Sequence, residues 1–363
     1  MGVKSICSRV YNRACSIINE QRDKKVMRRI VVIESDDWGS IRVPSRNVYD
    51  ALMAEGYAMD KRPYERYDCL ETDEDVKALS DVLLKYKDKN GRHPVLTLNY
   101  LSANPDFRKI KEKGYTEYIY EDVCNTYSRF PQSTNVIQMV KDGIEQGIFM
   151  PQCHGREHFN VTDWLNALRK GDKDVMTAFG YGMCGIFPKV DPAKGNQYMV
   201  ALKSHDDESQ KYVCDVVAQS LAIFRNIWGY ASRSFIAPCY TWNDKIENVL
   251  YNNGVELIQG VRVRRSSCNL SKKYLYAGEK NNGLIYGVRN CFFEPATTTN
   301  YSTDKLINEV GNVFKNKHIA VISSHRINYV GGIDINNRIK NLKLLDEFLS
   351  ALLMKYPDVE FMS

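Results

Sequence analysis

Short apolar runs alternate with amphipathic stretches along most of the chain. Runs rich in β-branched and other apolar residues predict strands at 29–33, 95–99, 147–152, 234–237, 255–259, 319–323 and 359–362. Between them, apolar residues recur every three or four positions, which is the spacing of one helix face. One helix is expected to begin after Thr72, and another to run from about Gln210 to Trp228 and stop at Gly229.

Strands that are separated by helices pair in parallel, because a parallel crossover needs room for a helix. The alternation therefore predicts an α/β fold, with a sheet that is open or closed into a barrel. About seven strands favour a distorted parallel (β/α) barrel. Two stretches, 171–205 and 262–301, fit the alternation poorly, and we expect them to be loop insertions in one catalytic domain spanning 29–363.

Residues 1–28 form a separate, basic segment ahead of the first strand. Such a segment could be a surface helix that touches acidic lipid. We favour a solvated helix whose apolar stripe, which includes Ile6 and Val10, packs on the body of the protein. The formal net charge of +6 is spread along the chain, so we expect no nucleic-acid partner of the kind bound by a clustered basic surface.

Composition favours a globular protein of the cytoplasm. Apolar residues make up 44% of the chain, enough for a sizeable core, and no run of 18 apolar residues and no secretory leader pattern occurs. The 10 cysteines form no CxxC pairs, so they indicate free thiols in a reducing compartment rather than zinc fingers or a disulfide framework.

Acidic residues and histidines follow several predicted strands, and the carboxyl ends of parallel strands are where such folds place their sites. The first strand runs into Asp36 and Asp37. Two adjacent buried carboxylates are costly unless they are paired, and a bound cation would remove that cost. The alternative is an aspartate that caps the next helix or turn.

The predicted strand at 147–152 is followed by His154 and His158, which can meet one metal ion if the segment coils into a turn. With Glu157 they also match the H-x-x-E-H signature, in which Glu157 would be the general base of a metallopeptidase. We favour that reading less, because a strand precedes the motif and Pro151 and Gly155 crowd it, whereas a peptidase needs both histidines in a helix.

Two more strand ends carry candidate chemistry. After the strand at 234–237, Pro238 and Tyr240 form a turn that can aim backbone N–H groups at a bound oxygen, although an ordinary strand-to-helix connection is the alternative. The strand at 319–323 leads to His325, a group that can act as an acid near neutral pH.

In this order, Asp-Asp, His-x-x-x-His, a Pro-aromatic turn and Ser-His resemble the motifs of the NodB-like polysaccharide deacetylases, a carbohydrate esterase family, over about residues 29–326. The family fold is a distorted (β/α) barrel. The resemblance implies a divalent metal ion, Zn²⁺ with Co²⁺ or Ni²⁺ as alternatives, bound by Asp37, His154 and His158. It also implies that Asp36 is the general base and His325 the general acid.

The resemblance also bears on the substrate. The oxyanion would be held by the metal ion and by a backbone N–H near Tyr240, in the turn that begins at Pro238. Trp38, Trp242 and Tyr240 would form an apolar surface under a sugar ring.

The sequence departs from the family at three points. Gly155 stands where the family has Ser or Thr, and Ile236 where its turn has Arg. The family element that orients the acid histidine is not evident, and Arg289 and Glu294 are the candidates to replace it.

We therefore expect a metal-dependent hydrolase that removes N-acetyl or O-acetyl groups from an acetylated glycan or sugar. One alternative is another amide hydrolase on the same barrel, including the H-x-x-E-H metallopeptidase. A second is a catalytically silent relative that only binds glycans.

Overall fold

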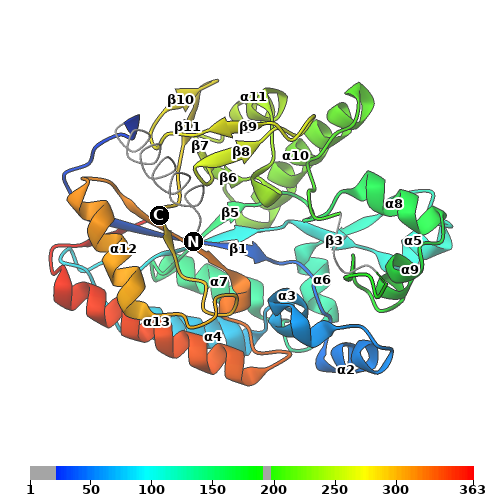
Figure 1. Ribbon diagram of the computed structural model, residues 1–363, viewed down its shortest axis with the longest axis horizontal. Coiled ribbons are helices and arrows are strands. Elements are labelled where there is room, and N and C mark those ends of the chain that lie inside the picture. The colour runs from blue at the N-terminus through cyan, green and yellow to red at the C-terminus, as the bar shows by residue number, and fades with distance from the viewer. Residues whose placement is uncertain (1–21, 191–197) are drawn as a thin grey trace, which may run out of the picture.

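A central, mostly parallel sheet organises the computed structural model, which describes residues 22–190 and 198–363 (Figure 1). Its strands follow the order β10-β11-β7-β6-β5-β2-β1-β13-β12, and β14 pairs with β1. All pairs are parallel except β10 with β11. The bounds are β1 (Ile30–Trp38), β2 (Leu96–Tyr100), β5 (Phe149–Cys153), β6 (Ser234–Ile236), β7 (Leu257–Gln259), β10 (Lys280–Asn281), β11 (Leu284–Tyr286), β12 (Cys291–Phe292), β13 (Ala320–His325) and β14 (Glu360–Met362).

Each predicted strand overlaps an observed one, namely β1, β2, β5, β6, β7, β13 and β14. The stretch 262–301 also contributes β10, β11 and β12 to the same sheet, although no apolar run marks them. Two small antiparallel sheets lie apart from it: β3 (Ala103–Pro105) with β4 (Tyr120–Asp122), and β8 (Val263–Arg265) with β9 (Lys272–Tyr274).

Helices fill the connections between the strands. Their bounds are α2 (Arg46–Ala54), α3 (Pro63–Tyr67), α4 (Asp73–Leu83), α5 (Phe107–Glu112), α6 (Val123–Arg129), α7 (Val136–Glu145), α8 (Val161–Arg169), α9 (Lys173–Gly180), α10 (Asp207–Trp228), α11 (Asp244–Asn252), α12 (Thr303–Lys315) and α13 (Ile335–Lys355), with short 3-10 turns η1 (Met59–Lys61), η3 (Pro238–Tyr240) and η4 (Arg326–Asn328). The helix expected after Thr72 begins there, because Thr72 and Asp75 form a capping box. The helix expected from Gln210 begins at Asp207, and Gly229 ends it at φ 80°.

One segment, the connection between β11 and β12, links the two edges of the central sheet. Residues 284–286 pair with β7, Arg289 N–H donates to Gly260 O, and Asn290 N–H donates to Val321 O in β13. Only four residues separate β11 from β12, so the sheet must curve to bring its edges within reach. The described strands nevertheless form a sheet with two edges, and a closed ring of strand pairs is not present among them.

Helices cover the sheet on both sides of the view in Figure 1, with α4, α7, α12 and α13 below and α10 and α11 above. Their apolar faces enclose one large core that includes Trp38, Tyr100, Phe149 and Leu345. A separate cluster of apolar side chains joins α5, α8 and α9 around the buried Trp164. The sheet that carries the site is therefore held in place by apolar packing against several helices.

Most of the basic N-terminal segment lies outside the described residues, and its expected helix with it. Within residues 22–190 and 198–363, no helix is both long and apolar enough to cross a membrane. The cytoplasmic location stays a prediction.

Candidate active site

A bulge at the end of β1 turns two consecutive carboxylates toward one site. Successive residues of a regular strand point to opposite faces of the sheet. The pairing of β1 with β2 shifts register between Ser35 and Trp38, and Asp37 takes the left-handed conformation at φ 73°. A bulge of this kind re-aims a side chain. Asp36 and Asp37 are both buried, and each has a different set of partners.

Asp37, His154 and His158 form a cluster in which one ligand atom of each lies within 4.8 Å of the others. Asp37 Oδ1 is 3.5 Å from His154 Nε2 and 3.6 Å from His158 Nε2. Among the described residues, Asp37 Oδ1 and His154 Nε2 are buried without a hydrogen-bond partner. Buried polar atoms normally have partners, and one carboxylate with two imidazoles is a donor set that suits Zn²⁺ and similar ions. The cluster therefore fits a divalent metal ion.

The protonation states suit that fit. His154 Nδ1 lies 2.9 Å from the carbonyl oxygen of Ile236, so Nδ1–H donates there and the ring turns Nε2 toward Asp37. Burial lowers the pKa of His158 to about 4, which keeps this imidazole neutral at pH 7. Burial opposes ionisation of Asp37, but the neighbouring histidines hold the pKa of its carboxyl well below the usual value.

The loop between the two histidines depends on Gly155. This residue has φ +105°, a conformation that L side chains rarely adopt, and it lets the chain turn between His154 and His158. The backbone conformation at this position therefore explains why a glycine stands here.

Gly155→Ser is expected to lower the free energy of unfolding by about 1–3 kcal/mol, because the new side chain would strain the backbone at this φ. Urea denaturation of the variant and the wild type measures the change. Gly180→Ser is the matched control, since Gly180 has an ordinary φ and no atom within 4 Å of the place where its Cβ would lie. Equal losses in both variants would contradict the backbone explanation.

Asp36 is held by Arg289, which lies in the segment between β11 and β12. Nη1 and Nη2 of Arg289 each donate to an oxygen of Asp36 at 2.7 Å, and Nε donates to Glu34 at 2.7 Å. Burial alone would raise the pKa of Asp36, but Arg289 lowers it to about 2. Arg289 thus supplies the guanidinium that contacts Asp36, whereas Ile236 at the end of β6 carries no charge.

Two amide side chains complete the surroundings of Asp36. Asn99 Nδ2 donates to Asp36 Oδ1 at 2.8 Å and to Gln259 Oε1 at 2.7 Å. Each is the last residue of a strand predicted from the sequence. Sequence reasoning missed both, although a polar residue at the carboxyl end of an apolar strand was the signal that identified the aspartates and histidines.

His325 lies next to Asp36 because the two residues are partners in the parallel register of β1 and β13. Its Nε2 is 3.8 Å from Asp36 Oδ2, and its Nδ1 is 2.6 Å from Glu294 Oε1. Burial lowers the pKa of His325, but Glu294, Asp36 and Asp37 together raise it to about 10. At neutral pH the imidazolium therefore carries a proton on Nε2, facing Asp36. Of the two candidates to orient this histidine, Glu294 contacts it and Arg289 contacts Asp36.

In the turn after β6, the backbone N–H of Tyr240 itself is not free to hold an oxyanion, and the role of a neighbouring N–H of this turn stays a prediction. Pro238 is buried at the start of η3, and the backbone N–H of Tyr240 donates to Ala237 O at 2.9 Å. That N–H is therefore engaged within the turn. The Tyr240 side chain does reach the site, with its hydroxyl 3.4 Å from Nη1 of Arg289.

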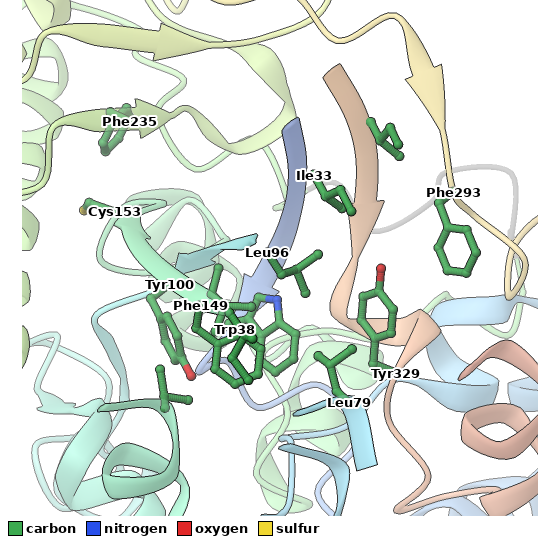
Figure 2. Close-up of a cluster of buried hydrophobic side chains, with 14 of the residues drawn as sticks. Ile33, Trp38, Leu79, Leu96, Tyr100, Phe149, Cys153, Phe235, Phe293 and Tyr329 are labelled. Carbon is green, nitrogen blue, oxygen red and sulfur yellow. The ribbon is translucent and has the colours of Figure 1, made fainter. Parts of the chain in front are cut away.

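The expectation that Trp38 and Trp242 underlie a sugar ring is not supported. Trp38 is 1% exposed and packs among Tyr100, Tyr329 and other core side chains (Figure 2). Trp242 is 0% exposed, and its Nε1 donates to Glu247. Neither indole presents a face to a ligand. Trp38 and Trp242 each follow polar or turn residues in the sequence. At such positions the sequence does not tell whether a side chain packs in the core or faces the site.

The metallopeptidase reading of the H-x-x-E-H motif also lacks its structural context. The residues from His154 to His158 form an irregular loop after β5 and not a helix. Glu157 is buried and forms an ion pair with Arg156, which also donates to Gln219. Glu157 is thus engaged in a buried ion pair and is not placed as the general base of a peptidase.

Comparison with known proteins gives no sequence match, either to a family model or to a curated protein. Several solved structures are similar, and among them are polysaccharide deacetylases and carbohydrate esterases. The family 4 carbohydrate esterase of Streptomyces lividans aligns at 9% identity and a TM-score of 0.38, over 93% of this chain and 92% of that one. The peptidoglycan deacetylase of Bacillus subtilis aligns at 10% identity and a TM-score of 0.37, over 92% of this chain and 87% of that one.

A 4-alpha-glucanotransferase from Thermococcus litoralis has 11% identity and a TM-score of 0.43, over 94% of this chain and 39% of that chain. This chain therefore spans about two fifths of the glucanotransferase. With TM-scores below 0.5, none of these similarities bears on function, which has to be inferred from the geometry of the site.

Proposed function

We propose that this chain is a metal-dependent hydrolase that removes acetyl groups from a carbohydrate. The observation that carries the proposal is the convergence of three units at the carboxyl ends of β1, β5 and β13. These units are the Asp37, His154 and His158 cluster, the Asp36–Arg289 pair and the His325–Glu294 pair. They provide a metal site, a carboxylate base and a protonated acid within one small volume.

Asp37, His154 and His158 would hold the metal ion. A divalent ion bound there, Zn²⁺ in our proposal, supplies Lewis acidity, which polarises a carbonyl and makes water more acidic. The donor set also accommodates Co²⁺ or Ni²⁺.

Asp36 is the proposed general base. It is ionised at neutral pH, and Arg289 holds its two oxygens in a fixed plane. The proton of the attacking water passes to Asp36. A carboxylate with so low a pKa is a weak base, so it depends on a water molecule that is already acidified.

His325 is the proposed general acid. It is protonated at neutral pH, and Glu294 fixes its ring from the side opposite to Asp36. The Nε2 proton passes to the leaving nitrogen or oxygen of the sugar as the bond to the acetyl carbon breaks. Glu294 keeps its contact with Nδ1 throughout, which preserves the ring orientation.

Replacing Glu294 by Gln is expected to move the alkaline limb of the kcat/KM profile to lower pH by about 1–3 units, because an opposite charge next to His325 is lost. His325 must be protonated to act, so activity at low pH should change less than activity at high pH. The pH dependence of kcat/KM in both proteins, with an NMR titration of His325, measures the shift. An unmoved alkaline limb would show that Glu294 does not set the protonation of the acid.

Acetate release from acetylated chito-oligosaccharides by the purified chain, with and without added Zn²⁺ or Co²⁺, tests the proposed function. Release that requires the metal ion supports it, and sugar O-acetyl esters form the second substrate set. Binding of these glycans without any turnover would favour the silent glycan-binding protein instead. Asp36→Asn separates these outcomes, because a binder keeps its glycan affinity and has no turnover to lose.

A further inference from the structure

A pocket opens beside the proposed metal ligand His158. It lies between the loop that follows β1, the histidine loop and the segment around residue 184, and its lining includes Arg42, Phe159, Cys184 and Met199. His158 belongs to both the pocket and the metal cluster. A substituent that enters this pocket is therefore attached close to the reacting acetyl group.

The guanidinium of Arg42 in this pocket lacks a good acceptor. Its Nη1 lies 3.1 Å from Met199 Sδ, a weak acceptor, and its Nε is 3.6 Å from Asp68 Oδ2. Asp68 already accepts three hydrogen bonds from Arg326 at 3.0–3.1 Å. Within the described part of the chain, the Arg42 side chain, which is 22% exposed, donates no hydrogen bond to an oxygen, and its charge is balanced by an ion pair with Asp68 and by the nearby charge of Asp37.

A half-enclosed arginine without oxygen acceptors is unusual, because such groups are normally satisfied by protein or by ligand atoms. The planar fork of the guanidinium matches the two oxygens of a carboxylate or a phosphate. A second cation lies beside the neighbouring turn: the backbone of Arg265 pairs with Thr241, two residues after Cys239, and the Cys239 thiol donates to the carbonyl oxygen of Met199 in the pocket lining at 3.3 Å. Arg265 is exposed, and the ion pair with Asp244 belongs to its neighbour Arg264.

We propose that Arg42 binds an anionic group of the substrate, a carboxylate or a phosphate on or next to the acetylated sugar. This inference rests on the proposed function and narrows it to acidic glycans or phosphorylated sugars. Arg42 contributes to substrate specificity and takes no part in proton transfer.

Three N-acetylated substrates distinguish the sources of negative charge. A hyaluronan tetrasaccharide carries carboxylates, UDP-N-acetylglucosamine carries phosphates, and chitotetraose is uncharged. The wild type is expected to favour one of the charged substrates over chitotetraose by at least 10-fold in kcat/KM. Arg42→Gln should reduce that preference by about 10- to 100-fold, mainly through KM, because a charge-assisted hydrogen bond is lost. Arg42→Lys, which keeps the charge without the fork, should lie in between.

Arg233→Gln is the matched control. Arg233 is an exposed arginine that directly precedes β6, at the amino end of the strand and so away from the site at the carboxyl ends, and it pairs with Glu256 at 2.7 Å. Its replacement should leave the substrate preference unchanged. Circular dichroism melts of all variants verify that they fold.

The inference is overturned if the wild type uses chitotetraose as well as the charged substrates. It is also overturned if Arg42→Gln slows all three equally, since Arg42 would then act by positioning Asp37. If no substrate releases acetate, the proposed function fails. The inference about Arg42 is then tested by measuring the binding of the three compounds by calorimetry. Tighter binding of a charged compound than of chitotetraose, lost in Arg42→Gln, supports it; equal or undetectable binding overturns it.

Discussion

His154→Ala is expected to bind no divalent metal ion, whereas the wild type binds about one ion per chain. His154 is buried, and its Nε2 lies 3.5 Å from Asp37 Oδ1 with no other partner in the described structure. Its removal leaves two of the three donors, which is too few to hold the ion against water. Elemental analysis of the purified proteins after dialysis against Zn²⁺ measures the metal content.

A second measurement does not depend on activity. Saturation with an ion at about 100 times its Kd stabilises a folded protein by about 2.7 kcal/mol, so Zn²⁺ should raise the Tm of the wild type and not that of His154→Ala. His205→Ala is the matched control, because His205 is exposed and contacts Asp163 at 3.0 Å outside the cluster. Equal metal content in the wild type and both variants would rule out the site.

Arg289→Met is expected to lower the free energy of unfolding by about 3–5 kcal/mol, because it leaves the buried carboxylates of Asp36 and Glu34 without their cation. The two carboxylates would repel each other, and one would take up a proton. Urea denaturation at pH 7 measures the loss, which should shrink at lower pH as these groups are protonated. Acetate release should fall as well, since Asp36 loses the partner that orients it.

Asp36→Asn provides the contrast that separates stability from chemistry. Here Arg289 keeps its 2.7 Å contact with Glu34, so no unpaired charge is created and the stability loss should be smaller. The proposed base is lost, however, and kcat should fall by about 10²- to 10⁴-fold. Arg233→Met, which breaks only an exposed ion pair, should cost less than about 1 kcal/mol. Asp36→Asn with normal turnover would contradict the role of Asp36, and Arg289→Met as stable as Arg233→Met would contradict that of Arg289.

The sequence predicted the seven apolar strands and the motifs at their ends, because apolar runs and the residues that follow them are local in the chain. Asp37, His154 and His158 were expected to share a metal ion, and they do lie together. Their proximity follows from parallel pairing. Strands β1 and β5 flank β2 and run parallel to it, so their carboxyl ends lie at the same end of the sheet.

The partners of these residues required the tertiary structure. Arg289 and Glu294 lie in the stretch 262–301, whose short strands have no apolar run, so the sequence did not place that stretch at the two edges of the sheet. Pairing with β7 and then with β13 is what brings Arg289 to Asp36 and Glu294 to His325. The register of β1 and β13 likewise decides that Asp36 and His325 are neighbours.

Burial was the other property that the sequence left open. Trp38 and Trp242 stand beside site residues in the chain, yet both indoles point into the core, because a side chain's direction depends on the bulge or turn that carries it. Local pattern thus determined which residue types gather at the carboxyl ends of the strands. Long-range pairing and the curvature of the sheet decided which side chains meet there, since those contacts join segments up to 289 positions apart, as His325 and Asp36 are (325 − 36 = 289).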